Sequence, residues 1–241
     1  MVILFFLNSN QTEVHYTICF IFLNIFVLEF FHYFIIMALR VLILGHSFVR
    51  RLEEFSQSEP EWLNLGFDVT KIDVSFIGIG GGTIRGGTKC IINKGHMTAI
   101  HNIQPHIVYL QIGGNDLCDF DCKSLTLSQD IMSYAEFLLQ GYGVQHVVVG
   151  QLLPRFSRRC PADYNYKVCQ VNNELIKLCA SANNVTFWHH RGFWNDAQSL
   201  IGNDGVHLNQ RGLLKYSKSV RAGVGVTNKR FFCATNKQSL D

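Results

Sequence analysis

The sequence predicts an α/β fold in which five parallel strands form one sheet between two layers of helices. Short apolar segments alternate with longer amphipathic segments along most of the chain. Each connection between two apolar segments is long enough to hold a crossover helix, which a parallel sheet requires. Of the 241 residues, 48% are apolar and only 16% are charged, so the chain can bury a full core and is not an intrinsically disordered protein.

The first predicted strand, LRVLILG, is an uninterrupted apolar run, as expected of a strand that is buried on both faces. The second is β-branched and partly alternating, and the third and fourth are again apolar runs that end in glycine. In chain order, the predicted strands are residues 39–45, 67–78, 106–113, 144–150 and 184–188.

The segments that follow these strands have helical spacing. Leu127, Ile131 and Leu138, for example, recur at the interval of a helix whose apolar stripe packs on a sheet. Residues 223–241 lose this periodicity, and we expect a solvated C-terminal tail there. In chain order, the predicted helices are Ser47–Ser58, Cys90–Asn102, Leu125–Gln140, Tyr164–Ser181 and Gln210–Ala222.

Residues 1–36 form an apolar segment that differs from the rest of the chain. They hold 8 of the 19 phenylalanines and no lysine or arginine. The run from Thr17 to Ile36 is long enough, at about 1.5 Å per residue, to cross a hydrocarbon core of about 30 Å. Glu29 lies inside this run, and an acidic residue near the centre of a span costs about 2.5–3.5 kcal/mol on insertion scales.

Two interpretations of this segment are open. As a membrane anchor through residues 17–36, it would leave a domain at residues 37–222 on the cytosolic side, because three arginines closely follow the run. Alternatively, translation starts at Met37, the segment is a spurious upstream extension, and the protein is cytoplasmic. The absence of a linker before the first strand favours the second interpretation. A signal peptide fits less well because no positive charge precedes the run.

The loops after the first three predicted strands read GHSF, GIGGGT and GGND. In an open parallel sheet, ligands bind at the carboxyl ends of the strands, so these loops would share one edge. Ser47 lies in the first loop, at a strand-to-helix turn where backbone N–H groups are free. A serine there is commonly a helix N-cap, so its position alone does not identify a nucleophile.

Other loops supply the remaining groups that acyl transfer needs. Asp204 lies three residues before His207, so one short turn can present a carboxylate that orients an imidazole for proton transfer from a serine. Residues 78–82 offer backbone N–H groups, and Asn115 offers a carboxamide donor. Donors of this kind stabilise a developing oxyanion by about 3–4 kcal/mol each. The combination at one edge of the sheet is more specific than any of its members.

These blocks resemble the SGNH hydrolase superfamily, also called GDSL-type esterases and lipases. VLILGHSFVRRL resembles the first block of the family and identifies Ser47 as the nucleophile, whose backbone N–H would also serve the oxyanion hole. QIGGNDL resembles the third block and identifies Asn115 as the side-chain donor. The resemblance covers about residues 39–222 and implies the SGNH hydrolase fold, a flavodoxin-like three-layer α/β/α sandwich.

Two further blocks complete the resemblance. GIGGGTI resembles the second block, whose glycine donor is Gly81, or the supporting residue Gly80, because the glycine run blurs the register. DGVHLN resembles the fifth block and identifies Asp204 and His207 as the partners of the nucleophile in a catalytic triad.

One residue departs from the family pattern, because the Gly-Asp-Ser of the first block reads Gly45-His46-Ser47 here. The change removes an anion and a hydrogen-bond acceptor from the nucleophile turn but removes no reaction role. We expect His46 to be a turn or surface histidine rather than an alternative base, since neighbouring side chains at a tight turn diverge. Together with Gly113 and Asp116 of the third block, Gly45 and His46 are expected to support the site.

The resemblance implies a serine esterase that hydrolyses or transfers a small acyl group through a covalent intermediate. It implies no cofactor and no metal. The substrates it implies are small acyl esters such as acetylated sugars, short-chain lipids or lysophospholipid-like molecules.

The alternative hypothesis is a catalytically weak SGNH-like domain of retroelement origin that acts in binding or in nucleic-acid association. Similar esterase domains occur in the first open reading frame of some LINE-type retroelements. Residues 37–241 carry a net charge of +5, but Arg155, Arg158 and Arg159 form a local group rather than a long basic stripe. We therefore interpret these arginines as solvated surface.

The cysteine and histidine residues outside these blocks do not form a pattern that predicts a metal site. The eight cysteines show no paired C-x₂-C spacing, and reduced thiols are expected. Cys118 and Cys122 are spaced to contact each other on a short helix. His189 and His190 follow the fifth predicted strand, and we expect packing or surface roles for them.

Overall fold

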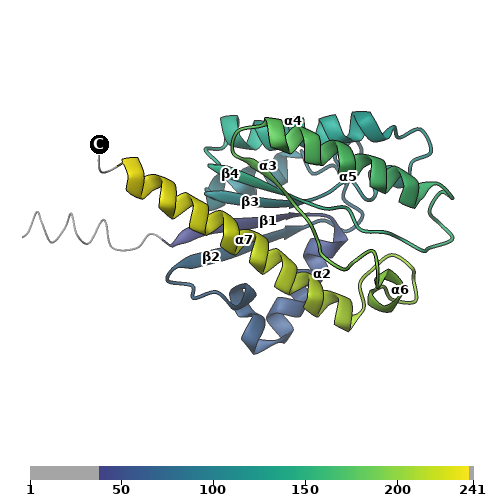
Figure 1. Ribbon diagram of the computed structural model, residues 1–241, viewed down its shortest axis with the longest axis horizontal. Coiled ribbons are helices and arrows are strands. Elements are labelled where there is room, and N and C mark those ends of the chain that lie inside the picture. Colours follow the sequence, from purple (N-terminus) through teal and green to yellow (C-terminus); the bar gives the residue numbers. More distant parts are fainter. Residues whose placement is uncertain (1–37, 239–241) are drawn as a thin grey trace, which may run out of the picture. The chain divides into compact units, whose positions relative to one another are not determined.

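The computed structural model describes residues 38–238, which form thirteen helices and strands (Figure 1). The strands are β1 (Leu39–Gly45), β2 (Ile72–Gly78), β3 (Ile107–Gln111), β4 (His146–Gly150) and β5 (Val185–Trp188). The α-helices are α2 (Ser47–Ser58), α3 (Lys94–Ile103), α4 (Ser124–Gly141), α5 (Tyr164–Ser181), α6 (Ala197–Leu200) and α7 (Gln210–Gln238). Two 3-10 helices, η1 (Pro60–Gly66) and η2 (Asp116–Cys118), lie in the connections.

The five strands form one parallel sheet in the order β2-β1-β3-β4-β5, which confirms the predicted fold class. The chain first adds β2 on one side of β1 and then returns to add β3 on the other side. The strand order therefore reverses between β1 and β3. In doubly wound sheets the ligand crevice opens at the carboxyl ends of the strands at this switch point.

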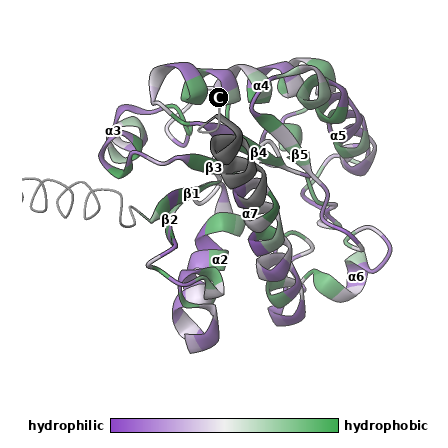
Figure 2. Ribbon diagram, turned by 60° about the vertical axis from the view of Figure 1, so that its left-hand side comes forward, coloured by the Kyte–Doolittle hydropathy of each residue, from purple (hydrophilic) through white to green (hydrophobic). Residues whose placement is uncertain are grey.

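The side chains of β1 alternate between two apolar layers. Val41 and Ile43 face a cluster that includes buried residues of α2 and α7. Leu42 and Leu44 face a second cluster, built largely from α4 and α5. All four side chains are fully buried, as expected for a central strand that is covered on both faces. Figure 2 shows α2 and α7 on one side of the sheet and α3, α4 and α5 on the other.

Two predicted elements begin four or five residues later than their sequence pattern indicates. The second strand begins at Ile72 because Asp68 closes a turn, in which its carboxylate accepts the N–H of Thr70 at 3.0 Å. Helix α3 begins at Lys94 because Asn93 is its N-cap, and the Asn93 side chain accepts the N–H of His96 at 2.9 Å. In both cases a short polar side chain competes with the apolar pattern and sets the boundary.

The prediction of a solvated tail at 223–241 is wrong, because α7 continues without a break to Gln238. Val224 is fully buried in the same cluster as Tyr216 and Val220, so the apolar stripe of α7 extends past Ala222. Gly223 brings α7 close to the sheet, since a Cβ there would lie 3.0 Å from the ring of Trp188.

Residues 1–36, for which a membrane anchor and an upstream extension were the two interpretations, lie outside the described residues. Between residues 38 and 238, no helix is both long enough and apolar enough to cross a membrane.

Replacing Val224 by Ala tests the contribution of the extended α7 to the core. Loss of two buried methyl groups should lower the free energy of unfolding by about 2 kcal/mol, measured by urea denaturation. Val226 lies two residues further along the helix and is 42% exposed, so Val226→Ala is the matched control and should change stability by less than about 0.5 kcal/mol. Equal stability of the two variants would contradict a packed α7 beyond residue 222.

Candidate active site

The turn between β1 and α2 is held by backbone contacts on both sides. Gly45 pairs with Gly78 of β2 and with Gln111 of β3. A Cβ at Gly45 would collide with the carbonyl oxygen of Gln111, so only glycine fits this close approach. The next N–H, that of His46, donates to the same carbonyl at 3.1 Å. Ser47 therefore lies at the switch point, as the first residue of α2.

His46 is the N-cap of α2, and its Nδ1 accepts the N–H of Phe48 at 3.3 Å. The expected turn role is thus observed, but the surface interpretation is wrong, because the residue is only 2% exposed. Burial is the main cause that lowers the pKa of His46 to about 3, and electrostatic interactions with Arg155 and His207 contribute to the same shift. The ring is consequently neutral, with Nδ1 committed as an acceptor to the backbone.

Ser47, His207 and Asp204 form a continuous hydrogen-bonded chain. The Ser47 Oγ lies 2.9 Å from His207 Nε2, and His207 Nδ1 lies 2.6 Å from Asp204 Oδ2. Ser47 lies near the beginning of the described sequence, and Asp204 and His207 lie near its end. The fold thus brings together residues as much as 160 positions apart. Phe48 packs edge-on against the His207 ring, with the ring centroids 6.2 Å apart.

Asp204 is fixed by its own turn as well as by the imidazole. Its Oδ1 accepts the backbone N–H groups of Val206 and His207, both at 2.9 Å. Partial burial raises the pKa of Asp204, but the hydrogen bonds from the His207 side chain and from these two N–H groups outweigh that effect and hold the pKa well below its ordinary value. Asp204 is therefore a carboxylate that can orient the histidine.

The same turn is tied to the segment that follows β4. Gly205 has a φ of +69°, and a Cβ there would collide with the backbone of Phe156 and Ser157. The N–H of Phe156 donates to the Gly205 carbonyl at 2.7 Å. The position of the Asp204 and His207 loop thus depends on the loop after β4.

The glycine-rich second loop and the third loop are joined by Asn115. Its Nδ2 donates to the carbonyl of Gly82 at 2.8 Å. Gly82 itself donates its N–H to Ile79 at 2.9 Å, which closes a turn with Gly81 at a φ of +72°, where a side chain would be strained. The structure therefore brings Gly80, Gly81 and Asn115 together at the loops beside the Ser47 turn.

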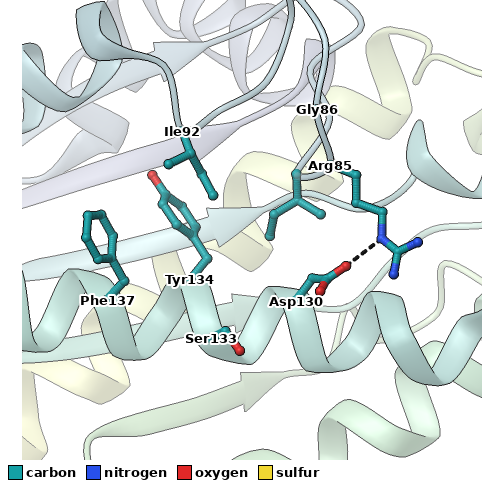
Figure 3. Close-up of a pocket in the computed structure, with 8 residues that line it drawn as sticks. Arg85, Gly86, Ile92, Asp130, Ser133, Tyr134 and Phe137 are labelled. Atoms are coloured by element: carbon teal, nitrogen blue, oxygen red, sulfur yellow. Dashed lines mark hydrogen bonds and ion pairs between the residues drawn. The ribbon is translucent and has the colours of Figure 1, made fainter.

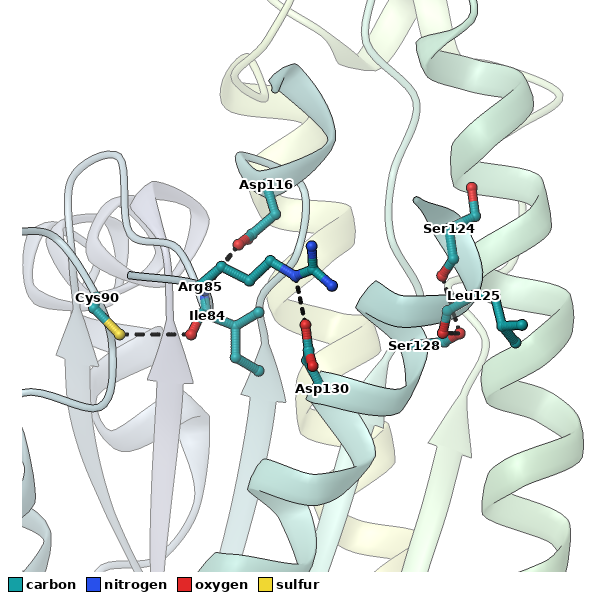
Figure 4. A network of polar contacts seen from close by, with 8 residues as sticks. All are labelled: Ile84, Arg85, Cys90, Asp116, Ser124, Leu125, Ser128 and Asp130. Atoms are coloured by element: carbon teal, nitrogen blue, oxygen red, sulfur yellow. Dashed lines mark hydrogen bonds and ion pairs between the residues drawn. The ribbon is translucent and has the colours of Figure 1, made fainter. Parts of the chain in front are cut away.

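Asp116 anchors the segment that follows the glycine run (Figure 4). Its Oδ1 accepts the backbone N–H groups of Ile84 and Arg85 at 3.0 and 3.1 Å. The Arg85 side chain then pairs with Asp130 of α4 at 2.5 Å. Burial raises the pKa of Asp116 more than the backbone hydrogen bonds lower it. The second loop is thus fastened both to the third loop and to a helix.

A pocket of about 520 Å³ lies between this anchored segment and α4 (Figure 3). Ile84, Ile92, Tyr134 and Phe137 give it an apolar lining, and the ion pair between Arg85 and Asp130 closes one side. Ser47, Asn115 and His207 are not among its lining residues, so the pocket flanks the second loop rather than containing the hydrogen-bonded chain.

Gly113 and Gly114 let the third loop pass close to its neighbours. Gly113 has a φ of +104°, which favours glycine. A Cβ on Gly114 would lie 3.0 Å from the Arg155 guanidinium and 3.4 Å from His46 Nε2. The hydroxyl of Tyr164 donates to the Gly114 carbonyl at 3.1 Å. These approaches bring the first and third loops together.

Arg155 lies beside Asn115 in the candidate site, although its sequence pattern predicts solvated surface, as it does for Arg158 and Arg159. That prediction is wrong for Arg155, which is only 5% exposed, whereas the other two are exposed. Its Nη2 donates to the Oδ1 of Asn115 at 2.9 Å. The one available signal was its position, because it follows β4 at the same edge of the sheet as the other loops.

The cysteines and His190 do not take part in the hydrogen-bonded chain of Ser47, His207 and Asp204. Cys118 Sγ lies 3.9 Å from Cys160 Sγ, and all six cysteines described between residues 38 and 228 are free. His190 is buried and has a packing role, with Nδ1 2.8 Å from Ser219 Oγ and Nε2 3.1 Å from Tyr109.

Residues 43–213 match the model of the GDSL-like lipase/acylhydrolase family. No curated protein sequence matches the chain. Among solved structures, a variant of an acetyl esterase with acetate ion has 15% identity and a TM-score of 0.59, covering 80% of this chain and 100% of that one. A GDSL-like lipase from Bacteroides thetaiotaomicron has 18% identity and a TM-score of 0.54, covering 78% and 89%. A variant of an acetyl-xylooligosaccharide esterase from Geobacillus Stearmophilus has 15% identity and a TM-score of 0.56, covering 79% and 96%.

The buried His46 should make stability depend on pH. Its pKa is about 3 in the folded protein and about 6.5 in the unfolded chain, so the unfolded state binds more protons between these values. Stability is therefore lost as the pH falls through this window. His46→Asn keeps an acceptor for Phe48 but cannot titrate. Urea denaturation at pH 7 and pH 5 should show a loss about 1–2 kcal/mol smaller in this variant than in the wild type.

His190, whose pKa burial also lowers to about 3, titrates in the same direction in both proteins, so the comparison isolates His46. An equal loss of stability in the variant and the wild type would contradict a buried, neutral His46.

Proposed function

The chain belongs to the GDSL-like lipase/acylhydrolase family and is a carboxylic-ester hydrolase of that type, and we propose that it works through a Ser47, His207 and Asp204 triad. The observation that carries the proposal is the unbroken hydrogen-bonded chain from Ser47 Oγ through the imidazole to the Asp204 carboxylate. Three groups so ordered form the arrangement that activates a serine hydroxyl on unrelated folds.

In the proposed reaction, Ser47 Oγ attacks the ester carbonyl carbon while His207 Nε2 takes the hydroxyl proton. Asp204 accepts the hydrogen bond of His207 Nδ1–H and stabilises the imidazolium. His207 then returns the proton to the leaving alcohol, which leaves an acyl group on Ser47. Water then attacks the acyl carbon while His207 Nε2 takes one of its protons. His207 returns this proton to Ser47 Oγ as the bond between Oγ and the acyl carbon breaks, which releases the carboxylic acid and regenerates Ser47.

The oxyanion is proposed to accept hydrogen bonds from the N–H of Ser47, the N–H of Gly81 and the carboxamide of Asn115. The first N–H groups of a helix have no intrahelical acceptor, which leaves that of Ser47 available. Asn115 uses one amide proton for Gly82, so its second amide proton is available to the substrate. These fixed donors stabilise the charge that develops on the carbonyl oxygen in the transition state.

His46 is proposed to cap the nucleophile helix and not to act as a base. Its Nδ1 accepts a backbone N–H, and burial keeps the ring neutral. The expectation that this turn loses a hydrogen-bond acceptor is therefore wrong, because His46 Nδ1 is an acceptor there, and only the negative charge of the aspartate is missing.

The proposed substrates are small acyl esters, acetyl esters among them, as the names of two of the structural neighbours suggest. The His207 side chain is 23% exposed and that of Asp204 is 47% exposed, so the triad reaches the surface. A leaving alcohol such as a sugar can then extend into solvent while the acyl group meets Ser47.

Replacing Ser47 by Ala tests the proposed nucleophile. We expect the wild type to hydrolyse p-nitrophenyl acetate and to be labelled on Ser47 by a fluorophosphonate probe, which mass spectrometry locates. Ser47→Ala should lose the label and at least about 1,000-fold in kcat/KM, because removal of a triad serine leaves only binding and oxyanion stabilisation.

Ser58 is an exposed serine at the other end of α2, so Ser58→Ala is the matched control and should keep both activity and label. Equal hydrolysis by the wild type and Ser47→Ala, or labelling at another serine, would exclude Ser47 as the nucleophile.

A further inference from the structure

Arg155 is a buried cation directly behind the proposed oxyanion donor. It lies in the loop after β4, and its side chain packs over the ring of Tyr164 at 5.3 Å. Its backbone is clamped by Asn165, whose side chain accepts the Arg155 N–H at 2.9 Å and donates to the Arg155 carbonyl at 2.8 Å. Both the position and the direction of this side chain are therefore fixed.

The guanidinium determines which way the Asn115 amide points. An arginine can only donate hydrogen bonds, so only the Oδ1 of Asn115 can face it, and the two groups lie 2.9 Å apart. The carbonyl of Gly82 can only accept, so only Nδ2 can face that side, at 2.8 Å. Two partners with opposite requirements thus exclude the flipped amide, in which the proposed donor would be an oxygen.

No carboxylate among residues 38–228 forms an ion pair with Arg155. Its other side-chain hydrogen bond runs from Nη1 to the Sγ of Cys118 at 3.3 Å. A charge that is buried without a counter-ion costs free energy. An anion that forms on the far side of Asn115 would compensate it.

We propose that Arg155 is a positioning residue for the oxyanion hole and acts through Asn115. This inference rests on the proposed function, because it assigns to Arg155 the task of orienting one donor of that site. Arg155 holds the amide plane and polarises it toward Oδ1, which makes the free Nδ2–H a stronger donor. The effect is largest when the substrate carbonyl oxygen carries a full charge, so it favours the transition state over the bound ester.

The geometry also indicates that lysine is a poor substitute. Nη2 and Nη1 reach Asn115 and Cys118 at the same time, and the planar group lies over Tyr164. A lysine ammonium keeps the charge and can donate to Asn115, but it lacks the fork that holds two acceptors in one plane. Arg155→Lys should therefore retain part of the effect and Arg155→Met none of it.

The first test compares steady-state kinetics of three full-length variants on p-nitrophenyl acetate. Arg155→Met should lower kcat about 10- to 100-fold with KM changed less than about threefold, and Arg155→Lys should recover part of kcat. Arg158→Ala is the matched control, since Arg158 is an exposed arginine of the same loop, and it should match the wild type. A rise in KM at constant kcat, or wild-type kinetics in Arg155→Met, would overturn the proposal.

The second test is a double-mutant cycle with Asn115→Ala, which separates positioning from a structural role. If Arg155 acts through Asn115, Arg155→Met should lower kcat by less than about threefold once the amide is gone. The same factor in both backgrounds would show that Arg155 does not act through Asn115. Thermal unfolding of each variant shows whether it is folded, and Arg155→Lys carries the test if Arg155→Met is not.

A third readout does not depend on catalysis. The side-chain amide signals of Asn115 in ¹H–¹⁵N spectra, assigned by comparison with Asn115→Ala, should shift in Arg155→Lys and Arg155→Met but not in Arg158→Ala. Unchanged Asn115 signals would overturn the positioning role. If the wild type is neither active nor labelled at Ser47, the proposed function fails, and these spectra still decide whether Arg155 orients the amide.

Discussion

The backbone contacts of Gly45 hold together the first three loops of the proposed site. The carbonyl of Gly45 accepts the N–H of Ile79 at 2.9 Å, and the next N–H, that of His46, donates to Gln111 at 3.1 Å. One peptide group thus links the carboxyl ends of three adjacent strands. Because a Cβ at Gly45 would collide with the Gln111 carbonyl, the central strand can approach β3 this closely only with glycine at its end. The turn that carries Ser47, the glycine-rich loop and the Asn115 loop all begin at this point.

Much of the fold and of the site could be predicted because it depends on local patterns. Uninterrupted apolar runs indicate buried parallel strands, and the loops after such strands share one edge by topology alone. Ser47, Asn115 and His207 were assigned from blocks that lie in those loops, and the structure brings them to the same region. The limits of α5, Tyr164–Ser181, were predicted to the residue because its apolar stripe is regular throughout.

The wrong predictions concern features that tertiary contacts determine, namely the end of α7 and the burial of Arg155. Helix α7 continues past Ala222 because Val224 enters the core, whereas the two nearby glycines weaken the helical signal in the sequence. Arg155 looks like its neighbours Arg158 and Arg159 in the sequence, because arginine is mostly exposed and burial leaves no local pattern. Its contact with Asn115 joins positions 40 residues apart, and only the folded sheet brings them together.

The proposed site has two fixed charges, the Asp204 carboxylate beside the imidazole and the Arg155 guanidinium beside the Asn115 amide. Asp204 is partly exposed and has its pKa held low by hydrogen bonds, so an anion supports the imidazole from the solvent side. Arg155 is buried, so a cation supports the amide from the protein side. As the proton moves from Ser47 to His207, positive charge develops next to the anion and negative charge develops next to Asn115. Each fixed charge therefore stabilises the separated state more than the neutral one. The buried His46 remains uncharged chiefly because burial disfavours its protonated form, and repulsion by Arg155 adds to this effect.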